Sequence, residues 1–334
     1  MEIGLALPQF DYSVPGQSPL RWETLARWAV RAEELGFGSL WLADHLFLDL
    51  ARYGGPPHAH AGFDALVALG GLARVTRTAR LGTLVLCAPL RPATVLAKAL
   101  ASLDVTSGGR LVVGLGAGWY EPEFAAAGIP FPPPGVRLEI LAETVQVVKG
   151  MFTQVPFSFA GRHARAVEAA CLPRPVQQPG PPVWVGGSGD RLMDVVARHA
   201  DGWNTAWSMT ADEYRRRGAV LDAACERAGR DPASVTRSLG LRALVGESAA
   251  DVGRRWRRLQ ELSPPGVLGG ATLDDWRRGN LVGTVDDVAG QLQGWKEMGV
   301  GTLVVSTGAV PFSVVSDDDL APLAAAATLF APWV

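Results

Sequence analysis

The sequence is poor in cysteine and has no long apolar run, and both absences narrow the kind of protein it encodes. Its three cysteines, Cys87, Cys171 and Cys225, lie far apart without a CxxC pair, so neither a disulfide framework nor a zinc knuckle is expected. No apolar run approaches the roughly 18 residues needed to cross a bilayer. The apolar stretch at residues 3–8 is too short for a signal-peptide core and lacks a basic flank. We therefore expect a cytoplasmic protein in a reducing compartment, with no membrane partner.

An excess of charge of one sign is also missing. The 31 Lys and Arg residues nearly balance the 33 Asp and Glu residues, and neither sign forms long runs. Binding to nucleic acid or to an anionic membrane depends on concentrated positive charge, so this balance argues against both. No internal repeat of solenoid period is present either. The expected partner is a small molecule.

The stretch at residues 110–123, RLVVGLGAGWYEPE, is the most informative part of the chain. Its apolar residues 111–115 predict a strand buried on both faces. The strand runs into Gly116, Ala117 and Gly118, whose small side chains let the backbone turn tightly around a bound group. These glycines also fit an ordinary sharp turn, because a short glycine pattern is weak evidence by itself.

The same alternation of strand and helix recurs along the whole chain. Strands are expected at residues 3–8, 39–43, 81–87, 111–115, 183–185, 202–206, 238–245 and 302–307. Helices are expected at residues 19–35, 63–75, 93–105, 136–152, 190–200, 210–228, 250–262 and 284–298, with an Ala-rich helix at the end. Eight strands alternating with helices predict an α/β fold, a (β/α)8 TIM barrel. We expect one domain over residues 1–334, with an inserted excursion at about 121–182 between the fourth and fifth strands and an irregular connection at 263–283.

In such a barrel the active site lies at the carboxyl ends of the strands, so the residues that follow each strand are the candidates. They are Gln9, Asp44, His45, Cys87, Gly116–Trp119, Gly186–Gly189 and Trp203–Thr205. His45 is a plausible proton donor or hydrogen-bond partner, although a single His at a strand end also serves to anchor loops.

A second glycine turn, Gly186-Gly187-Ser188-Gly189, opens directly onto a helix. The N–H groups of a first helical turn favour a phosphate, and the Ser188 hydroxyl would add a donor. The alternative is an ordinary turn with Ser188 as the helix N-cap. Two glycine turns beside His45 favour a phosphorylated cofactor that lies across the barrel mouth.

His58 and His60 raise the possibility of a metal hydrolase, because alternate histidines bind metal in many hydrolase barrels. They follow the loop at residues 54–57, and no set of carboxylates and histidines appears at the other strand ends. We therefore expect no metal site.

With these residues in view, the chain resembles the luciferase-like monooxygenase superfamily, in particular its oxidoreductases that use the deazaflavin coenzyme F420. The match covers nearly the whole length. It is carried by residues 35–45, 81–87, 96–104, 107–110, 114–119, 173–175, 182–187, 200–204 and 283–284.

The resemblance implies roles for individual residues. Asp44 and His45 would border the deazaflavin ring as the catalytic pair, and a non-proline cis peptide at Leu84–Val85 would press against the back of the ring. The full set of implied cofactor contacts is Leu84, Val85, Cys87, Gly116, Ala117, Gly118, Trp119, Gly186, Gly187, Ser188 and Gly189. Relatives often form homodimers, so a homodimer is implied as well.

One departure from the family bears on the substrate. Sugar-phosphate dehydrogenases of this group carry a carboxylate just after the first glycine turn, where this chain has Trp119, and Glu121 and Glu123 are displaced from that place. Together with Trp203 and Trp207, Trp119 suggests an apolar, unsaturated or aromatic substrate. The expected substrate contacts are Gln9, Trp119, Trp203 and Asn204.

The function expected from these observations is hydride transfer between coenzyme F420 and a small organic substrate. The first alternative is a monooxygenase that uses flavin mononucleotide (FMN). A non-catalytic flavin-binding barrel is an alternative of another class.

Overall fold

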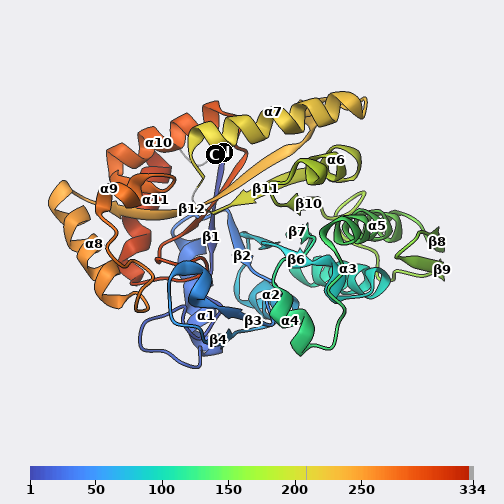
Figure 1. Ribbon diagram of the computed structural model, residues 1–334, viewed down its shortest axis with the longest axis horizontal. Coiled ribbons are helices and arrows are strands. Elements are labelled where there is room, and N and C mark those ends of the chain that lie inside the picture. Colours follow the sequence, from blue (N-terminus) through green and yellow to red (C-terminus); the bar gives the residue numbers. More distant parts are fainter. Residues whose placement is uncertain (208, 331–334) are drawn as a thin grey trace.

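A closed barrel of eight parallel strands forms the centre of the computed structural model, which describes residues 1–207 and 209–330 (Figure 1). The strands are β1 (Glu2–Ala6), β2 (Ser39–Leu42), β5 (Arg80–Thr83), β7 (Leu111–Gly116), β10 (Val183–Gly186), β11 (Gly202–Ala206), β12 (Thr236–Gly246) and β14 (Thr302–Ser306). They follow one another around the barrel in chain order, and β14 closes it by pairing with β1, where Ile3 lies opposite Leu303. The predicted (β/α)8 fold is confirmed.

Helices surround this barrel on the outside (Figure 1). They are α1 (Trp22–Glu34), α2 (Ala65–Val75), α3 (Ala93–Ser107), α5 (Pro134–Thr153), α6 (Asp190–His199), α7 (Ala211–Arg227), α8 (Ala249–Leu262), α10 (Val285–Glu297) and α11 (Leu320–Phe330). Each turns an apolar stripe to the strands, as α1 does with Leu25, Trp28 and Ala32. None of the helices in the described ranges is both long and apolar enough to cross a membrane.

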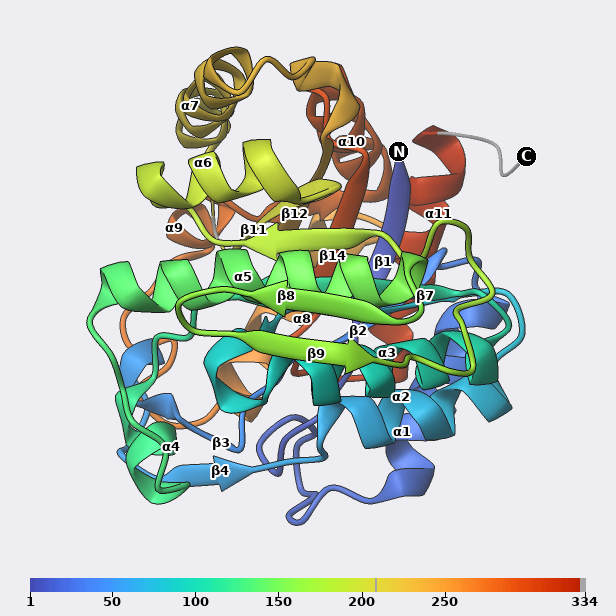
Figure 2. The ribbon, with the colours of Figure 1, turned by 90° about the vertical axis from the view of Figure 1, so that its right-hand side faces the viewer.

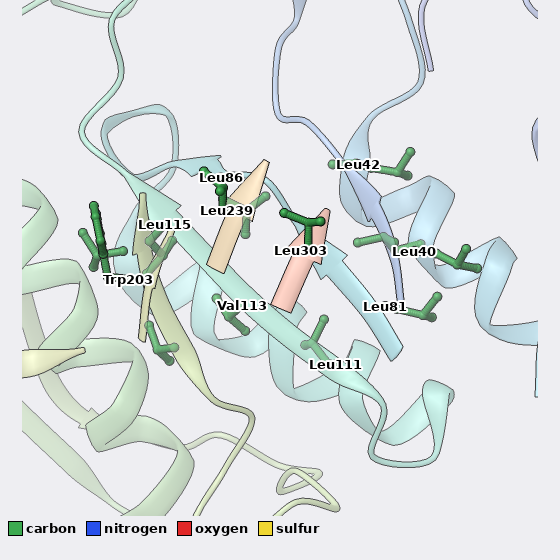
Figure 3. Close-up of a cluster of buried hydrophobic side chains, with 14 of the residues drawn as sticks. Leu40, Leu42, Leu81, Leu86, Leu111, Val113, Leu115, Trp203, Leu239 and Leu303 are labelled. Atoms are coloured by element: carbon green, nitrogen blue, oxygen red, sulfur yellow. The ribbon is translucent and has the colours of Figure 1, made fainter. Parts of the chain in front are cut away.

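Side chains alternate along each strand between the helix layer and the barrel interior. Leu111, Val113 and Leu115 of β7 point outward into the core beneath the helices (Figure 3). Val112 points inward, where the rings of Trp41 and Trp184 stack with their centroids 5.4 Å apart. These two tryptophans fill the barrel interior, so the space left for a ligand lies at the carboxyl ends of the strands.

The third barrel strand is interrupted where the sequence predicts. β5 ends at Thr83, a cis peptide joins Leu84 to Val85, and β6 (Leu86–Cys87) then pairs with the end of β7. The Thr83 hydroxyl spans the break: it accepts from the Gly114 N–H at 2.8 Å and donates to the Gly114 carbonyl oxygen at 2.9 Å. The cis peptide expected at Leu84–Val85 is confirmed.

The segment between β7 and β10 is more regular than the predicted excursion. It begins with α4 (Glu121–Ala126) and continues into α5, which is one of the barrel helices. Only then does an antiparallel hairpin follow, β8 (Phe157–Ala160) and β9 (Arg165–Ala169), which lies outside the barrel against the helix layer (Figure 2). The excursion proper is therefore this hairpin and the proline-rich return to β10.

Two further additions lie where the sequence suggests only loops. β3 (Phe47–Asp49), the 3-10 helix η1 (Leu50–Tyr53) and β4 (Ala59–Ala61) form a hairpin between β2 and α2. The expected irregular connection at 263–283 contains α9 (Leu273–Arg277) and most of β13 (Leu281–Thr284), which pairs with the end of β12. These elements are too short to show a periodic pattern, so the sequence indicates only a connection there.

Candidate active site

A cavity of about 410 Å³ opens at the carboxyl ends of the barrel strands. It is lined by Ala43, Asp44, His45, Leu48, Arg52, Tyr53, Leu84, Val85, Leu86, Cys87, Gly116, Gly118, Trp119, Glu123, Gly186, Gly187, Ser188, Asn204, Trp207, Pro311 and Phe312. His45 and both glycine turns therefore border one space, as the sequence analysis expects. Of the expected cofactor residues, Ala117 and Gly189 are not among those that line it.

His45 is held by a buried carboxylate. Its Nδ1 lies 3.2 Å from Oε1 and 3.3 Å from Oε2 of Glu123, on α4. The Glu123 side chain is only 1% exposed, and its Oε2 also accepts from the Leu46 N–H at 3.1 Å. Since Nδ1 faces this carboxylate, Nε2 is the ring nitrogen that remains for a ligand.

The sequence analysis treats Glu123 as displaced from the site, whereas the structure brings its carboxylate to the imidazole. The position directly after the glycine turn is indeed taken by Trp119, but the first turn of α4 carries Glu123 back toward the loop after β2. Phe124, which is fully buried, fixes that face of α4 against the protein. No local pattern in the sequence identifies Glu123, because its partner lies 78 positions away in the chain.

Asp44, predicted to be catalytic, lines the cavity, and its carboxylate is held by neighbouring residues. Its carboxylate receives two hydrogen bonds from the Arg91 guanidinium, at 2.5 and 2.8 Å, and one from the Cys87 N–H at 2.9 Å. Only 3% of the Asp44 side chain is exposed. These bonds tie the end of β2 to β6 and to Arg91.

Gln9 and Trp203, both expected to contact substrate, do not reach the cavity. The fully buried Gln9 amide binds the backbone of Ala43 through both its oxygen and its nitrogen, and the nitrogen also donates to the Phe63 carbonyl. Trp203 faces the helix layer, where its ring stacks on Tyr214. Its neighbour Asn204 lines the cavity, because consecutive residues of a strand point to opposite sides.

The two glycine turns form the floor of the cavity around Val85. A Cβ atom at Gly116 or at Gly186 would lie 2.7 Å from the Val85 side chain, too close for either residue to be larger. Gly118 adopts a φ of +75°, which favours glycine. Backbone atoms at the ends of β7 and β10 therefore face the ligand space directly.

The start of α6 beside this floor has no side-chain cap. Gly189, rather than Ser188, is its N-cap residue, so the predicted alternative of Ser188 as N-cap is wrong. The Ser188 side chain lines the cavity instead. This end of the cavity offers a hydroxyl and an uncapped helix N-terminus, which together suit an anionic group.

Aromatic side chains form the outer rim. The Trp119 ring lies 5.5 Å from the His45 ring, and the Arg52 guanidinium lies 4.2 Å from the centroid of Trp119. Tyr53, Trp207 and Phe312 complete this rim. The sequence analysis misses Arg52, Tyr53 and Phe312, because they belong to loop elements without a motif.

His58 and His60 lie on the β3–β4 hairpin, outside the residues that line the cavity. His60 Nδ1 lies 2.6 Å from Asp11 Oδ1, and the His58 and His60 rings are 4.8 Å apart. Over residues 1–207 and 209–330, no three His, Cys, Asp or Glu side chains gather as metal ligands.

All three cysteines are buried, so we expect native protein at pH 8 to react with none of its thiols. Burial, with Asp44 and Glu123 nearby, raises the pKa of Cys87 to about 12, and burial also raises the pKa of Cys171 and of Cys225. A raised pKa leaves the thiol protonated at pH 8, whereas the thiolate is the reactive form. Titration with Ellman's reagent should give no fast-reacting thiol in native protein and three in guanidinium chloride. One fast equivalent from the native chain would contradict this.

The model of the family described as luciferase-like monooxygenase matches residues 1–302 of the chain. The F420-dependent glucose-6-phosphate dehydrogenase of Amycolatopsis mediterranei is 34% identical over 54% of this chain, and the match spans about half of that relative, 52%. The F420-dependent hydroxymycolic acid dehydrogenase of Mycobacterium tuberculosis is 29% identical over 90% of this chain and 81% of its own.

A solved structure has the same fold. An F420-dependent secondary alcohol dehydrogenase, in complex with an F420-acetone adduct, superposes with a TM-score of 0.76 over 97% of both chains at 18% identity. The family match over residues 1–302 and the closed barrel lead to the same assignment. The chain belongs to the luciferase-like monooxygenase family.

Proposed function

We propose that this chain is an oxidoreductase that transfers a hydride between coenzyme F420 and a small organic substrate. The observation that carries the proposal is the single cavity in which His45, held by Glu123, faces two side-chain-poor turns. The F420-dependent enzymes among its relatives support this choice of cofactor. A homodimer and a cytoplasmic location stay predictions.

The cavity residues fit a flat ring with a phosphate tail. A volume of about 410 Å³ lies within the usual range for small-molecule sites, roughly 300–1,000 Å³. Leu84 and Val85 present an apolar surface, and the glycine floor lets a ring approach the backbone. Gly187 and Ser188, with the start of α6, would hold the phosphate.

When bound, the deazaflavin supplies the hydride donor or acceptor. The protein supplies the proton and the geometry. Glu123 accepts the Nδ1–H of His45 and so fixes the imidazole in one orientation, with Nε2 directed to the ligand. Nε2 takes the proton from a substrate hydroxyl during oxidation and returns it during reduction, to the alkoxide formed from a ketone or to the enolate formed when a hydride adds to a conjugated enone or enoic acid. The aromatic rim excludes water from this exchange.

We expect Gly186→Ala to weaken cofactor binding about tenfold, because the new methyl group displaces Val85 toward the ring; overpacking costs about 1–3 kcal/mol. Gly70→Ala, on α2 and outside the cavity lining, is the control, since apart from the backbone of its own helix no heavy atom lies within 4 Å of a Cβ added there. Fluorescence titration of each variant with F420 measures the two dissociation constants. Equal constants for the two variants would contradict the proposed floor.

The proposal is tested by titrating the purified chain with F420 and with FMN, each oxidised and reduced. We expect saturable binding of F420 and its reduction by one of a panel of alcohols, or its reoxidation by one of a panel of enones. Binding of FMN alone, with oxygen consumed, would replace the proposal by a flavin monooxygenase. Binding without turnover would favour a non-catalytic barrel.

A further inference from the structure

Arg52 places a positive charge on the rim of the cavity, close to His45. It lies in η1, the one turn of 3-10 helix between β3 and β4, and its Cζ is 4.2 Å from the centroid of the Trp119 ring. The Trp119 ring is in turn 5.5 Å from the His45 ring. The guanidinium and the imidazole therefore both contact one indole ring, and all three side chains line the same cavity.

The stack leaves the hydrogen-bonding edge of this guanidinium open. A guanidinium that packs its flat face on an aromatic ring keeps its N–H donors in the plane, where they match a carboxylate. Within residues 1–207 and 209–330, no carboxylate lies within ion-pair distance of Arg52, and its guanidinium has no hydrogen-bond acceptor. The stack also fixes the orientation of the side chain, so less entropy is lost when an anion binds.

The other charges of the cavity are already engaged. Asp44 is paired with Arg91, and Glu123 is paired with His45. Arg52 is the arginine of this lining, and within residues 1–207 and 209–330 no carboxylate forms an ion pair with it. Arg242 of β12 is a second cation near Tyr53. Burial raises the pKa of the Tyr53 hydroxyl, and the charges of Arg52 and Arg242 partly offset this rise.

The surface around Arg52 is apolar and aromatic. Leu48, Trp207, Pro311 and Phe312 line the rest of the outer cavity. A ligand that fills this space must have a flat apolar body, and a charged group on it must be negative to gain from Arg52.

We propose that the substrate is a carboxylic acid with a flat, unsaturated body, whose carboxylate binds the edge of Arg52 while its reacting carbon lies beside His45. This inference rests on the proposed function, because it names the substrate class of the same site. Arg52 is then the residue that selects acids over neutral molecules of the same shape.

The test compares acids with their neutral amides of nearly identical shape. Crotonate, cinnamate and 5-phenylpentadienoate, each with its amide, are titrated into the chain with and without oxidised F420, and quenching of tryptophan fluorescence gives the dissociation constants. We expect at least one acid to bind about tenfold more tightly than its amide at low salt, the size typical of a charge-assisted hydrogen-bonded pair.

The variants are Arg52→Gln, Arg52→Lys and the control Arg165→Gln, which changes an exposed arginine of β9 outside the cavity. Arg52→Gln should bring the acid-to-amide ratio to about one by weakening the acid alone, while Arg165→Gln keeps the wild-type ratio. Arg52→Lys should retain part of the preference, because it keeps the charge and loses the planar fork.

The inference is overturned by equal binding of acids and amides by the wild type, by a ratio unchanged in Arg52→Gln, or by no binding of any acid. A loss of F420 affinity in Arg52→Gln equal to the loss of acid affinity also overturns it, because Arg52 would then serve the cofactor. If the wild type does not bind F420, the proposed function is wrong. The acid-to-amide ratio of affinities measured without F420 still tests the role of Arg52 in that case.

Discussion

Replacing His45 with Ala should lower turnover with F420 at least tenfold while the affinity for the cofactor stays within about twofold. A positioned proton donor or acceptor usually contributes about 10²- to 10⁴-fold to the rate, so a loss of at least tenfold is a conservative lower bound. The imidazole exchanges the substrate proton through Nε2, whereas the cofactor floor is made by the glycine turns and Val85. Steady-state kinetics and a separate fluorescence titration of F420 measure the two quantities.

Glu123→Gln provides the second half of this experiment. The amide keeps the shape of the buried side chain, but it no longer holds Nδ1 of His45 with a carboxylate. We expect kcat to fall about tenfold with little change in KM, because the neutral amide no longer stabilises the imidazolium that forms when Nε2 takes the proton, while the imidazole keeps its contact with substrate. Full activity in both His45→Ala and Glu123→Gln would remove the pair from the reaction.

Asp44→Ala should destabilise the fold by about 3 kcal/mol, the low end of the cost of breaking a buried ion pair. The substitution leaves the Arg91 guanidinium with only its contact to Asp64, at 3.1 Å, and leaves the Cys87 N–H without its acceptor. Urea denaturation followed by circular dichroism measures the loss.

The matched control is Asp64→Ala, which removes the other carboxylate from Arg91. The Asp64 side chain is 43% exposed and caps α2, so its removal should cost only about 1 kcal/mol. The double variant Asp44→Leu with Arg91→Met should recover part of the stability lost in Asp44→Ala, since no unpaired charge stays buried. Wild-type stability in Asp44→Ala together with lost turnover would return Asp44 to a catalytic role.

Long periodic segments made the barrel predictable. The α1 stripe of Leu25, Trp28 and Ala32 repeats at helical spacing, and residues 111–115 of β7 are uniformly apolar because both faces of the strand are buried. Short elements without a period were not predictable in this way. β13 has only four residues, and it forms because it pairs with the otherwise unpaired end of β12.

The expected site residues form two groups: those whose place in the cavity follows from the end of a strand, and those whose orientation depends on the register of the strand. Gly116, Gly186 and His45 follow directly from strand ends, and the structure brings all three to the cavity. Gln9 follows β1 and Trp203 lies within β11. Gln9 binds backbone and Trp203 faces the helices, because the register of each strand decides which side chain points inward. A shift of one residue separates Trp203 from Asn204.

By itself the sequence determined the barrel, the two glycine turns and the histidine at the end of β2, since each of these is encoded in neighbouring residues. Only the tertiary structure decided that Glu123 holds a histidine 78 positions away, that Asp44 belongs to Arg91, and that Arg52 lies on Trp119. The physical reason is that the closed barrel brings distant segments together and so sets the partner of each buried charge. Neighbouring residues in the sequence do not indicate which distant segment that is.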